Sequence, residues 1–349
     1  MRNPDNTEYN KSLLTWNIRF SLHSIYRLFI CLLFLVTPLK SDTISILFEN
    51  DLFAGTDKHY TNGVRIGWLD DSLHKDEQIN YSQLMYKTID AIPYLYLDPH
   101  KKHNAGFSLY QMMFTPQDIT ATEANYDDIP YTGHLIFSFF LFEYDSNSYD
   151  EYKLQFGIVG PLSGAANVQK FFHRLTHSTQ PQGWDTQLGN HLTAGITYDH
   201  GTRLWQKEIG YGLSSDFIGS YGIQLGNFYT GAAARGVWRV GNNYPDNFNA
   251  FYSDVIGDSA LLGLQESSEE FGWSVNLGLT LNGIAYFYVT DADTDYNIQR
   301  KPYLGDALLS LSFYFQDFEL SLTKQIKFSL SNPSDNTLSY GAASLLWKF

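Results

Sequence analysis

Apolar and polar residues alternate strictly along several stretches of this chain. In residues 273–282 (WSVNLGLTLN), every second residue from Trp273 onward is Trp, Val or Leu, and the residues between them are Ser, Asn, Gly or Thr. The same period recurs in residues 152–158 and 309–315, and in the final segment that ends at Phe349. Because successive side chains of a strand point to opposite faces, this period predicts β-strands with one apolar face and one polar face.

The alternating segments are numerous and are separated by polar connections. Segments of about ten residues with this pattern are typical of transmembrane β-barrels, in which one face contacts lipid and the other lines the lumen. We count about twelve, near residues 43–53, 59–70, 104–115, 133–146, 151–161, 191–213, 216–227, 229–241, 271–289, 304–315, 318–330 and 337–349. An even count lets the wall close without an edge. The sequence therefore predicts an all-β fold, a transmembrane antiparallel β-barrel of about 12 strands.

The lengths of the connections indicate which end of the barrel faces the periplasm. Short turns are expected at residues 145–149, 214–216 and 316–317, and short turns are typical of the periplasmic end. The connection 162–190 then lies at the outer end. Within it, residues 165–177 lack Pro and Gly and predict a short helix in an extracellular loop.

Composition and the N-terminus narrow the class of protein. Aromatic residues make up 16% of the 349 residues, charged residues only 17%, and the mean hydropathy of −0.25 excludes a bundle of hydrophobic helices. Residues 28–36 (LFICLLFLV) follow several basic residues and are too short to span a bilayer, so we expect residues 1–41 to be a secretory signal peptide rather than an anchor helix. Residues 42–349 would form the barrel domain, which lacks cysteine because Cys31 lies in the signal.

Net charge limits the partners of the barrel domain. Removing residues 1–41 leaves 18 Lys/Arg and 35 Asp/Glu, a net charge of −17. Such a surface does not favour nucleic acid, and it suits an anionic membrane surface bridged by divalent cations. We expect the barrel to be a monomer in the outer membrane of a Gram-negative bacterium, surrounded by outer-membrane lipids.

Polar residues concentrate where the first two predicted strands meet, in residues 48–68 (FENDLFAGTDKHYTNGVRIGW). Strand parity places Asn50 on the lipid side of the wall and Asp51 on the lumen side. Thr61 follows on the lumen side of the second strand, unless a β-bulge shifts the phase. All three residues are expected near the outer rim, where the helix in residues 165–177 also emerges.

Four motifs in this order resemble a known family, the outer-membrane lipid A 3′-O-deacylases. They are FEND (48–51), YTNG (60–63), MFTP (113–116) and GIVGP…VQKFFH (157–173). The resemblance implies a twelve-stranded barrel that uses Ca²⁺ to hydrolyse an ester of lipid A, the membrane anchor of lipopolysaccharide. It also implies functional roles for five residues: Asn50, Asp51, Thr61, Gln169 and His173.

Two residues of the family pattern are missing. The family has a catalytic lysine in the loop after the third strand, and residues 115–128 (TPQDITATEANYDD) contain none. A glutamate expected shortly after His173 is also absent, with Gln180 or Asp185 as the nearest substitutes. Substrate contacts, and activity itself, are placed in doubt by these departures.

The five residues have the chemistry that ester hydrolysis needs. His173 can accept a proton from water, because a histidine titrates near neutral pH. Asp51 is the natural charged ligand of a Ca²⁺ ion, with Asn50 and Thr61 adding oxygen atoms. Gln169, four residues before His173 on one helix face, could position the head group or the water.

Other interpretations of the same residues remain open. An Asn-Asp pair at a strand end is most often a solvated loop, and a lone loop histidine is most often a surface residue. His173 and His177 have zinc-like spacing but lack a third ligand. No G-x-S-x-G motif supports a serine nucleophile. The competing function is a non-catalytic barrel, either porin-like or an adhesin.

Overall fold

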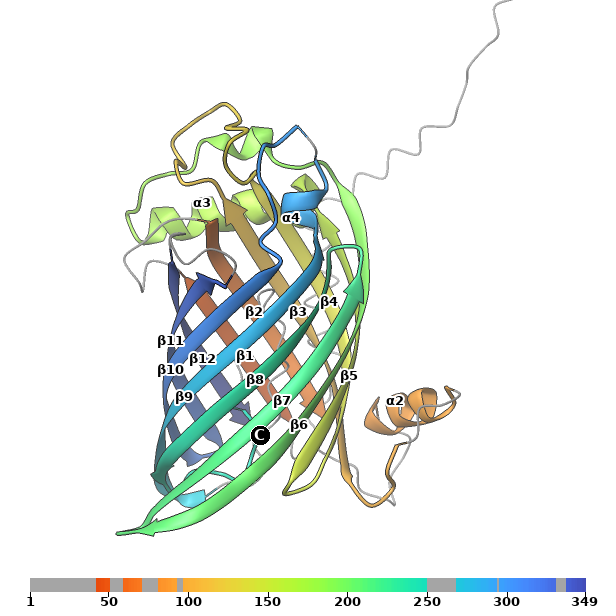
Figure 1. Cartoon of the computed structure of the whole chain (residues 1–349), viewed down its shortest axis with the longest axis vertical. Helices are drawn as coiled ribbons and strands as arrows, with labels where there is room; N and C mark the ends of the chain where they lie inside the picture. The colour runs from red at the N-terminus through yellow and green to blue at the C-terminus, as the bar shows by residue number, and fades with distance from the viewer. Residues whose placement is uncertain are drawn as a thin grey trace, which may run out of the picture. The chain divides into compact units, whose positions relative to one another are not determined.

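Twelve antiparallel strands form a closed barrel within the described part of the chain (Figure 1). The structure is a computed structural model and describes residues 42–50, 59–70, 81–92, 97–249, 268–293, 295–330 and 337–349. The strands are β1 (Thr43–Asn50), β2 (His59–Asp70), β3 (Lys102–Thr115), β4 (Thr132–Tyr144), β5 (Ser148–Val159), β6 (His191–Gly210), β7 (Leu213–Gly226), β8 (Tyr229–Asn242), β9 (Ser268–Phe287), β10 (Tyr303–Gln316), β11 (Phe318–Ser329) and β12 (Leu338–Lys348). Each strand pairs with its chain neighbours, and β1 pairs with β12. The predicted fold class is confirmed. The predicted signal peptide, residues 1–41, lies outside the described residues.

Helices lie at both ends of the barrel. The helices are α2 (Tyr81–Asp90), α3 (Ala165–Leu175) and α4 (Tyr288–Asp291), with 3₁₀ turns η2 (Pro161–Ser163) and η3 (Gly183–Thr186). α3 and α4 lie at the end drawn uppermost in Figure 1, and α2 lies beside the opposite end, where the short turns are. The helix predicted in an extracellular loop is thus α3. Among the described residues, none of the helices has the length and apolar character needed to cross a membrane.

The two faces of the wall follow the predicted alternation. On β10, Leu309 is 47% exposed while its neighbour Leu308 is 5% exposed. Leu311, Phe313 and Phe315 continue the exposed row, as expected for a surface that lipid covers. Outward-facing and lumen-facing positions can therefore be assigned along each regular strand from its register.

Packed side chains fill both halves of the lumen. Near the short-turn end, Phe248 from the β8–β9 connection enters a buried cluster and lies 5.1 Å, centroid to centroid, from the Tyr149 ring. Asn247 beside it is fully buried and hydrogen-bonds Arg239 of the wall. Near the other end, Phe228 and Val289 of the outer connections join a second buried cluster. Buried side chains therefore occupy the lumen near both ends of the barrel.

The turn between β6 and β7 differs from the sequence-based prediction. The turn was expected at residues 214–216, but those residues lie within β7. The chain reverses instead at Tyr211 and Gly212, whose φ angles are 56° and 73°. Two successive residues with positive φ form the tight hairpin turn whose twist matches that of the flanking strands, and glycine favours it.

Candidate functional site

α3 lies on the outward face of the barrel wall, at the outer rim. Its buried residues are Ala165, Gln169 and His173, which are spaced by four and therefore form one stripe along the helix. Ala165 packs in a cluster with Met113 of β3 and Trp184 of η3. The polar candidates Gln169 and His173 thus face inward toward the wall, whereas the other helix residues apart from Ala165 are half-buried or exposed.

A glycine of β4 lets the helix approach the wall closely. A Cβ built on Gly133 would point outward and lie less than 3.0 Å from atoms of both Ser163 and Ala165, a distance that real Cβ atoms do not show. The absence of a side chain at residue 133 therefore sets the separation between α3 and β4. The position of Gln169 and His173 depends on this contact.

The end of β1 meets α3 on the same outer face. Phe48 and Asn50 share the outward parity of the exposed Ile46. The rings of Phe48 and Phe172 lie 5.6 Å apart, centroid to centroid, and Phe172 precedes His173 in the chain. Asn50 is only 7% exposed although it faces outward, so protein rather than lipid covers it. The structure therefore brings the end of β1 to the helix that carries His173.

One nitrogen of His173 is held by the main chain. Nδ1 lies 2.5 Å from the carbonyl oxygen of Thr179. A carbonyl oxygen can only accept, so Nδ1 must carry the hydrogen, and Nε2 of the neutral ring is then the basic nitrogen. The side chain is 5% exposed. Its orientation and its tautomer are both fixed, which a general base requires.

The amide of Gln169 is oriented by a buried tryptophan. The indole Nε1 of Trp184 donates a 2.7 Å hydrogen bond to Oε1 of Gln169. Since an indole N–H can only donate, the amide must turn its oxygen to Trp184 and its NH₂ group away from it. Within the described part of the chain, that buried Nε2 atom has no hydrogen-bond partner. The site therefore contains an aimed and unpaired donor.

The remaining candidate ligands are only partly described. Asp51 lies outside the described residues. Thr61 lies in β2 with its side chain outside the described part, and the strand register shifts between Tyr60 and Asn62. This irregularity interrupts the strand parity, so parity does not decide whether Thr61 faces the lumen. Asn50 pairs with Asn62, the residue after Thr61, so the two candidates lie near the ends of adjacent strands.

The hydrogen-bond partners of Gln169 and His173 were not predicted from the sequence. Trp184 and the carbonyl of Thr179 supply the contacts, whereas Asp185, one of two suggested substitutes for the family glutamate, is exposed. The sequence does not show which backbone carbonyl a histidine will contact. A lone tryptophan predicts a buried side chain, but it does not identify the acceptor of the indole N–H. His177 lies beyond the end of α3, with a φ angle of 55° and an exposed side chain, so it does not share the buried stripe.

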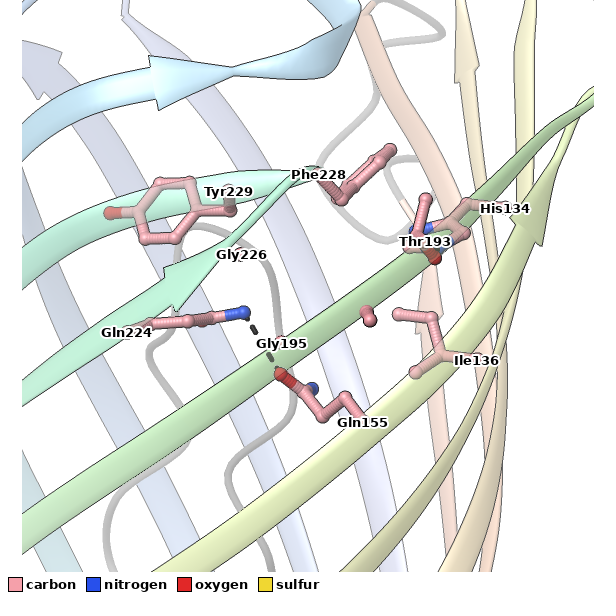
Figure 2. A pocket seen from close by; sticks show the side chains of 10 residues that line it. His134, Ile136, Gln155, Thr193, Gly195, Gln224, Gly226, Phe228 and Tyr229 are labelled. Atoms are coloured by element: carbon pink, nitrogen blue, oxygen red, sulfur yellow. Dashed lines mark hydrogen bonds between the residues drawn. The ribbon is translucent and has the colours of Figure 1, made fainter.

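A pocket in the lumen is separate from this arrangement (Figure 2). It is lined by His134, Thr193, Gln155 and Gln224, among others, and Gln224 donates a 3.0 Å hydrogen bond to Gln155 across it. His134 faces the lumen, whereas the adjacent Gly133 faces α3, so the pocket and the helix lie on opposite faces of β4. Its empty volume of about 280 Å³ includes space that is open to solvent, so only part of it is enclosed by the protein.

The oxygen donors at the rim are suited to a hard cation. Asn50 offers an amide oxygen, and Asp51 and Thr61 would add a carboxylate and a hydroxyl, the donor types that Ca²⁺ prefers. Within the described residues, no group of three or more His, Cys, Asp or Glu side chains is placed to hold a metal ion. Because Asp51 lies outside those residues, the assigned ligands remain a prediction.

Comparisons with known proteins identify the family. The family described as "Outer membrane protein LpxR" matches residues 28–349. Among solved structures, LpxR from Salmonella typhimurium aligns with a TM-score of 0.69 at 15% identity, covering 88% of this chain and 100% of that chain. The β domain of the Bordetella autotransporter BrkA aligns at a TM-score of 0.43 and 10% identity, covering 89% of this chain and 99% of its own. A search of curated protein sequences gave no match. The family match spans most of the chain, and the chain therefore belongs to the LpxR family of outer-membrane proteins.

Proposed function

We propose that the protein is a Ca²⁺-dependent hydrolase that removes the 3′-linked acyloxyacyl group of lipid A. The observation that carries the proposal is the buried stripe of α3, which holds Gln169 and a tautomer-fixed His173 against the outward face of the wall. This face at the outer rim borders the leaflet that contains lipopolysaccharide. Membership of the LpxR family supports a lipid A-modifying activity of this kind.

His173 is the proposed general base. Nδ1 is engaged by the Thr179 carbonyl, so Nε2 takes the proton from the attacking water. The oxygen of that water then bonds to the ester carbonyl carbon, and the proton returns to the departing sugar oxygen as the carbon–oxygen ester bond breaks. The products are a carboxylic acid and a free hydroxyl, and no other reactant is needed.

Gln169 is the proposed hydrogen-bond donor at the reacting ester. Its Nε2 is turned away from Trp184 and is free to donate to an oxygen atom of the substrate. A donor aimed in advance at the oxygen that gains negative charge stabilises the transition state more than the ground state. In this role Trp184 is a positioning residue, since it acts through the Gln169 amide.

A calcium ion would be held by Asp51, with Asn50 and Thr61 as further oxygen ligands. When bound, this cation would polarise the ester carbonyl and stabilise the negative charge that develops there. Asn50 is the last residue of β1, Asp51 follows it in the chain, and Thr61 is the third residue of β2. Gln169 is not proposed as a ligand, because its carbonyl oxygen is directed at the indole N–H of Trp184.

The outer side of α3 can contact acyl chains. Phe171 is 54% exposed and Leu175 is 64% exposed, and both lie on the helix that carries the proposed base. Exposed apolar side chains of this size at a lipid-facing rim favour contact with hydrocarbon. The scissile ester would then lie between the helix and the wall, with its acyl chains toward the membrane.

The test is mass spectrometry of lipid A from cells that express wild-type protein or single variants. Wild-type protein should release the 3′-linked acyloxyacyl group. His173→Ala should lower turnover by roughly 10²–10⁴-fold, which is typical of general-base catalysis. The matched control is His177→Ala, which removes an exposed histidine just beyond the same helix and should leave turnover unchanged. Unchanged lipid A with folded wild-type protein and ample Ca²⁺ would instead indicate a non-catalytic barrel, and full activity in His173→Ala would refute only the mechanism.

A further inference from the structure

α2 packs on the outside of the barrel at the end opposite to α3 (Figure 1). Ile89 of the helix forms a buried cluster with Ala105 of β3 and Leu141 of β4. These two wall residues pair directly in the sheet, and Leu141 pairs with Tyr152 of β5, so the three form a row across three strands. Their parity is that of the outward-facing residues, yet Ala105 and Leu141 are fully buried because the helix and Leu97, from the connection after it, cover them.

This row lies at the edge of the lipid-facing belt. On the side toward the outer rim, β5 continues with Leu154 and Phe156, which are exposed apolar residues. On the side toward the short turns, the next outward row consists of paired polar residues, His103, Glu143 and Asp150. His103 and Glu143 are joined by a 3.1 Å hydrogen bond. The change from apolar to polar rows marks the boundary between the hydrocarbon core and the head groups of the periplasmic leaflet.

The orientation of α2 matches this boundary. A helix turns by about 100° per residue, so Leu84 and Thr88 lie along one flank of α2, while Tyr86, Lys87 and Asp90 lie along the other. Ile92 follows two residues after the end of the helix. Tyr86 contacts His103 of the polar row edge-on, at 4.7 Å between ring centroids. The opposite flank is therefore directed toward the hydrocarbon side.

The flank on the hydrocarbon side is apolar and exposed. Leu84 is 55% exposed and Ile92 is 46% exposed. Thr88, between them, donates its hydroxyl to the carbonyl oxygen of Leu84 at 2.8 Å, which satisfies that polar group within the helix. Lys87 and Asp90 are exposed on the other flank, where water is expected. A helix with this division of residues is typical of one that lies in the plane of a membrane interface.

We infer that α2 is an interfacial helix that docks into the periplasmic leaflet, with phospholipid as its partner. Leu84 and Ile92 insert below the head groups, beside the belt of the barrel wall, while Lys87 and Asp90 remain in the aqueous head-group layer. The helix thereby fixes the depth of this side of the barrel in the membrane. This inference rests on the barrel's place in the outer membrane and is independent of any catalytic activity.

The experiment measures the depth of single residues in a reconstituted bilayer. Residues 42–349 contain no cysteine, so Leu84→Cys or, as the matched control on the opposite flank, Lys87→Cys gives the barrel a single thiol. Each is labelled with a polarity-sensitive fluorophore and placed in vesicles of phosphatidylethanolamine and phosphatidylglycerol. Heat-modifiable gel migration verifies that each variant is folded.

The two labels should behave oppositely. The label at residue 84 should emit at shorter wavelength and lose most of its intensity when nitroxide-bearing phospholipids are included, but little intensity when iodide is added to the water. The label at residue 87 should be quenched mainly by iodide. Equal quenching of both labels by iodide, with no effect of the nitroxide lipids on residue 84, would overturn the inference.

Discussion

Replacing Gly133 with alanine should separate α3 from the barrel wall. The added Cβ would lie 2.3 Å from the Cβ of Ala165, whereas ordinary contacts begin at 3.4 Å, so the helix or the strand must move by roughly 1 Å. A displacement of about 1 Å between catalytic groups can lower turnover by on the order of 10²-fold. Overpacking of this kind also destabilises a fold by about 1–3 kcal/mol. We expect a large loss of activity with a smaller loss of stability.

The assay compares lipid A turnover by mass spectrometry with urea unfolding in lipid vesicles. Gly283→Ala is the matched control, because Gly283 is also an outward-facing strand glycine, but its nearest atoms to a built Cβ lie 3.9 and 4.0 Å away. It should leave turnover unchanged. Combining Gly133→Ala with Ala165→Gly removes the clashing methyl group and should recover part of the activity.

The reasoning would be refuted if Gly133→Ala retained full turnover in a folded barrel. It would also be refuted if Gly133→Ala and Gly283→Ala lowered turnover equally, since the effect would then arise from strand glycines in general. A failure of Gly133→Ala to fold is distinguished from both by heat-modifiable gel migration, and the double variant then tests whether the clash is the cause.

Three further predictions concern the site and the lumen. Trp184→Phe keeps an aromatic ring against Tyr131 but removes the hydrogen-bond donor to Gln169. The value of kcat/KM should therefore fall by roughly 10-fold, which corresponds to the loss of one hydrogen bond. An unchanged kcat/KM in steady-state kinetics would contradict the positioning role of Trp184. Asp51→Ala should weaken the proposed metal site, so its defect should shrink as Ca²⁺ is raised in the mass-spectrometric assay, and a defect that does not respond to Ca²⁺ would argue against ligation. Planar-bilayer recordings should show poor conductance, because buried side chains fill both halves of the lumen; large and stable single-channel currents would favour the porin-like alternative.

The strands were predictable because a membrane barrel imposes one simple rule on each residue. Every position faces either lipid or lumen, so the two-residue period is visible in segments such as 309–315, where Leu309 and Leu311 are exposed and Tyr314 is buried. The helix in residues 165–177 was predictable for a similar reason, since its sequence lacks Pro and Gly and the observed helix ends at Leu175. The prediction was wrong for residues 176 and 177, which lie beyond the end of the helix.

The contacts within the site could not be predicted, because they join segments through atoms that leave no pattern. The Thr179 carbonyl that orients His173 belongs to the main chain and would be present with any residue at that position. The pairing of Trp184 with Gln169 depends on how the loop after α3 folds back. The register shift beside Thr61 could not be predicted either. The sequence is equally compatible with a regular strand that has no shift at this position.

The unpaired amide of Gln169 links the fold to the proposed chemistry. Leaving a buried donor without a partner costs about 1–3 kcal/mol, and a helix face against an apolar wall could avoid that cost with an aliphatic residue. Trp184 prevents the amide from reversing, because reversal would oppose the indole N–H with an NH₂ group. The arrangement therefore keeps a donor available at a position where the described protein offers it no acceptor. Under the proposed function the acceptor is the substrate ester oxygen, so the cost of the empty site is offset only when substrate is bound.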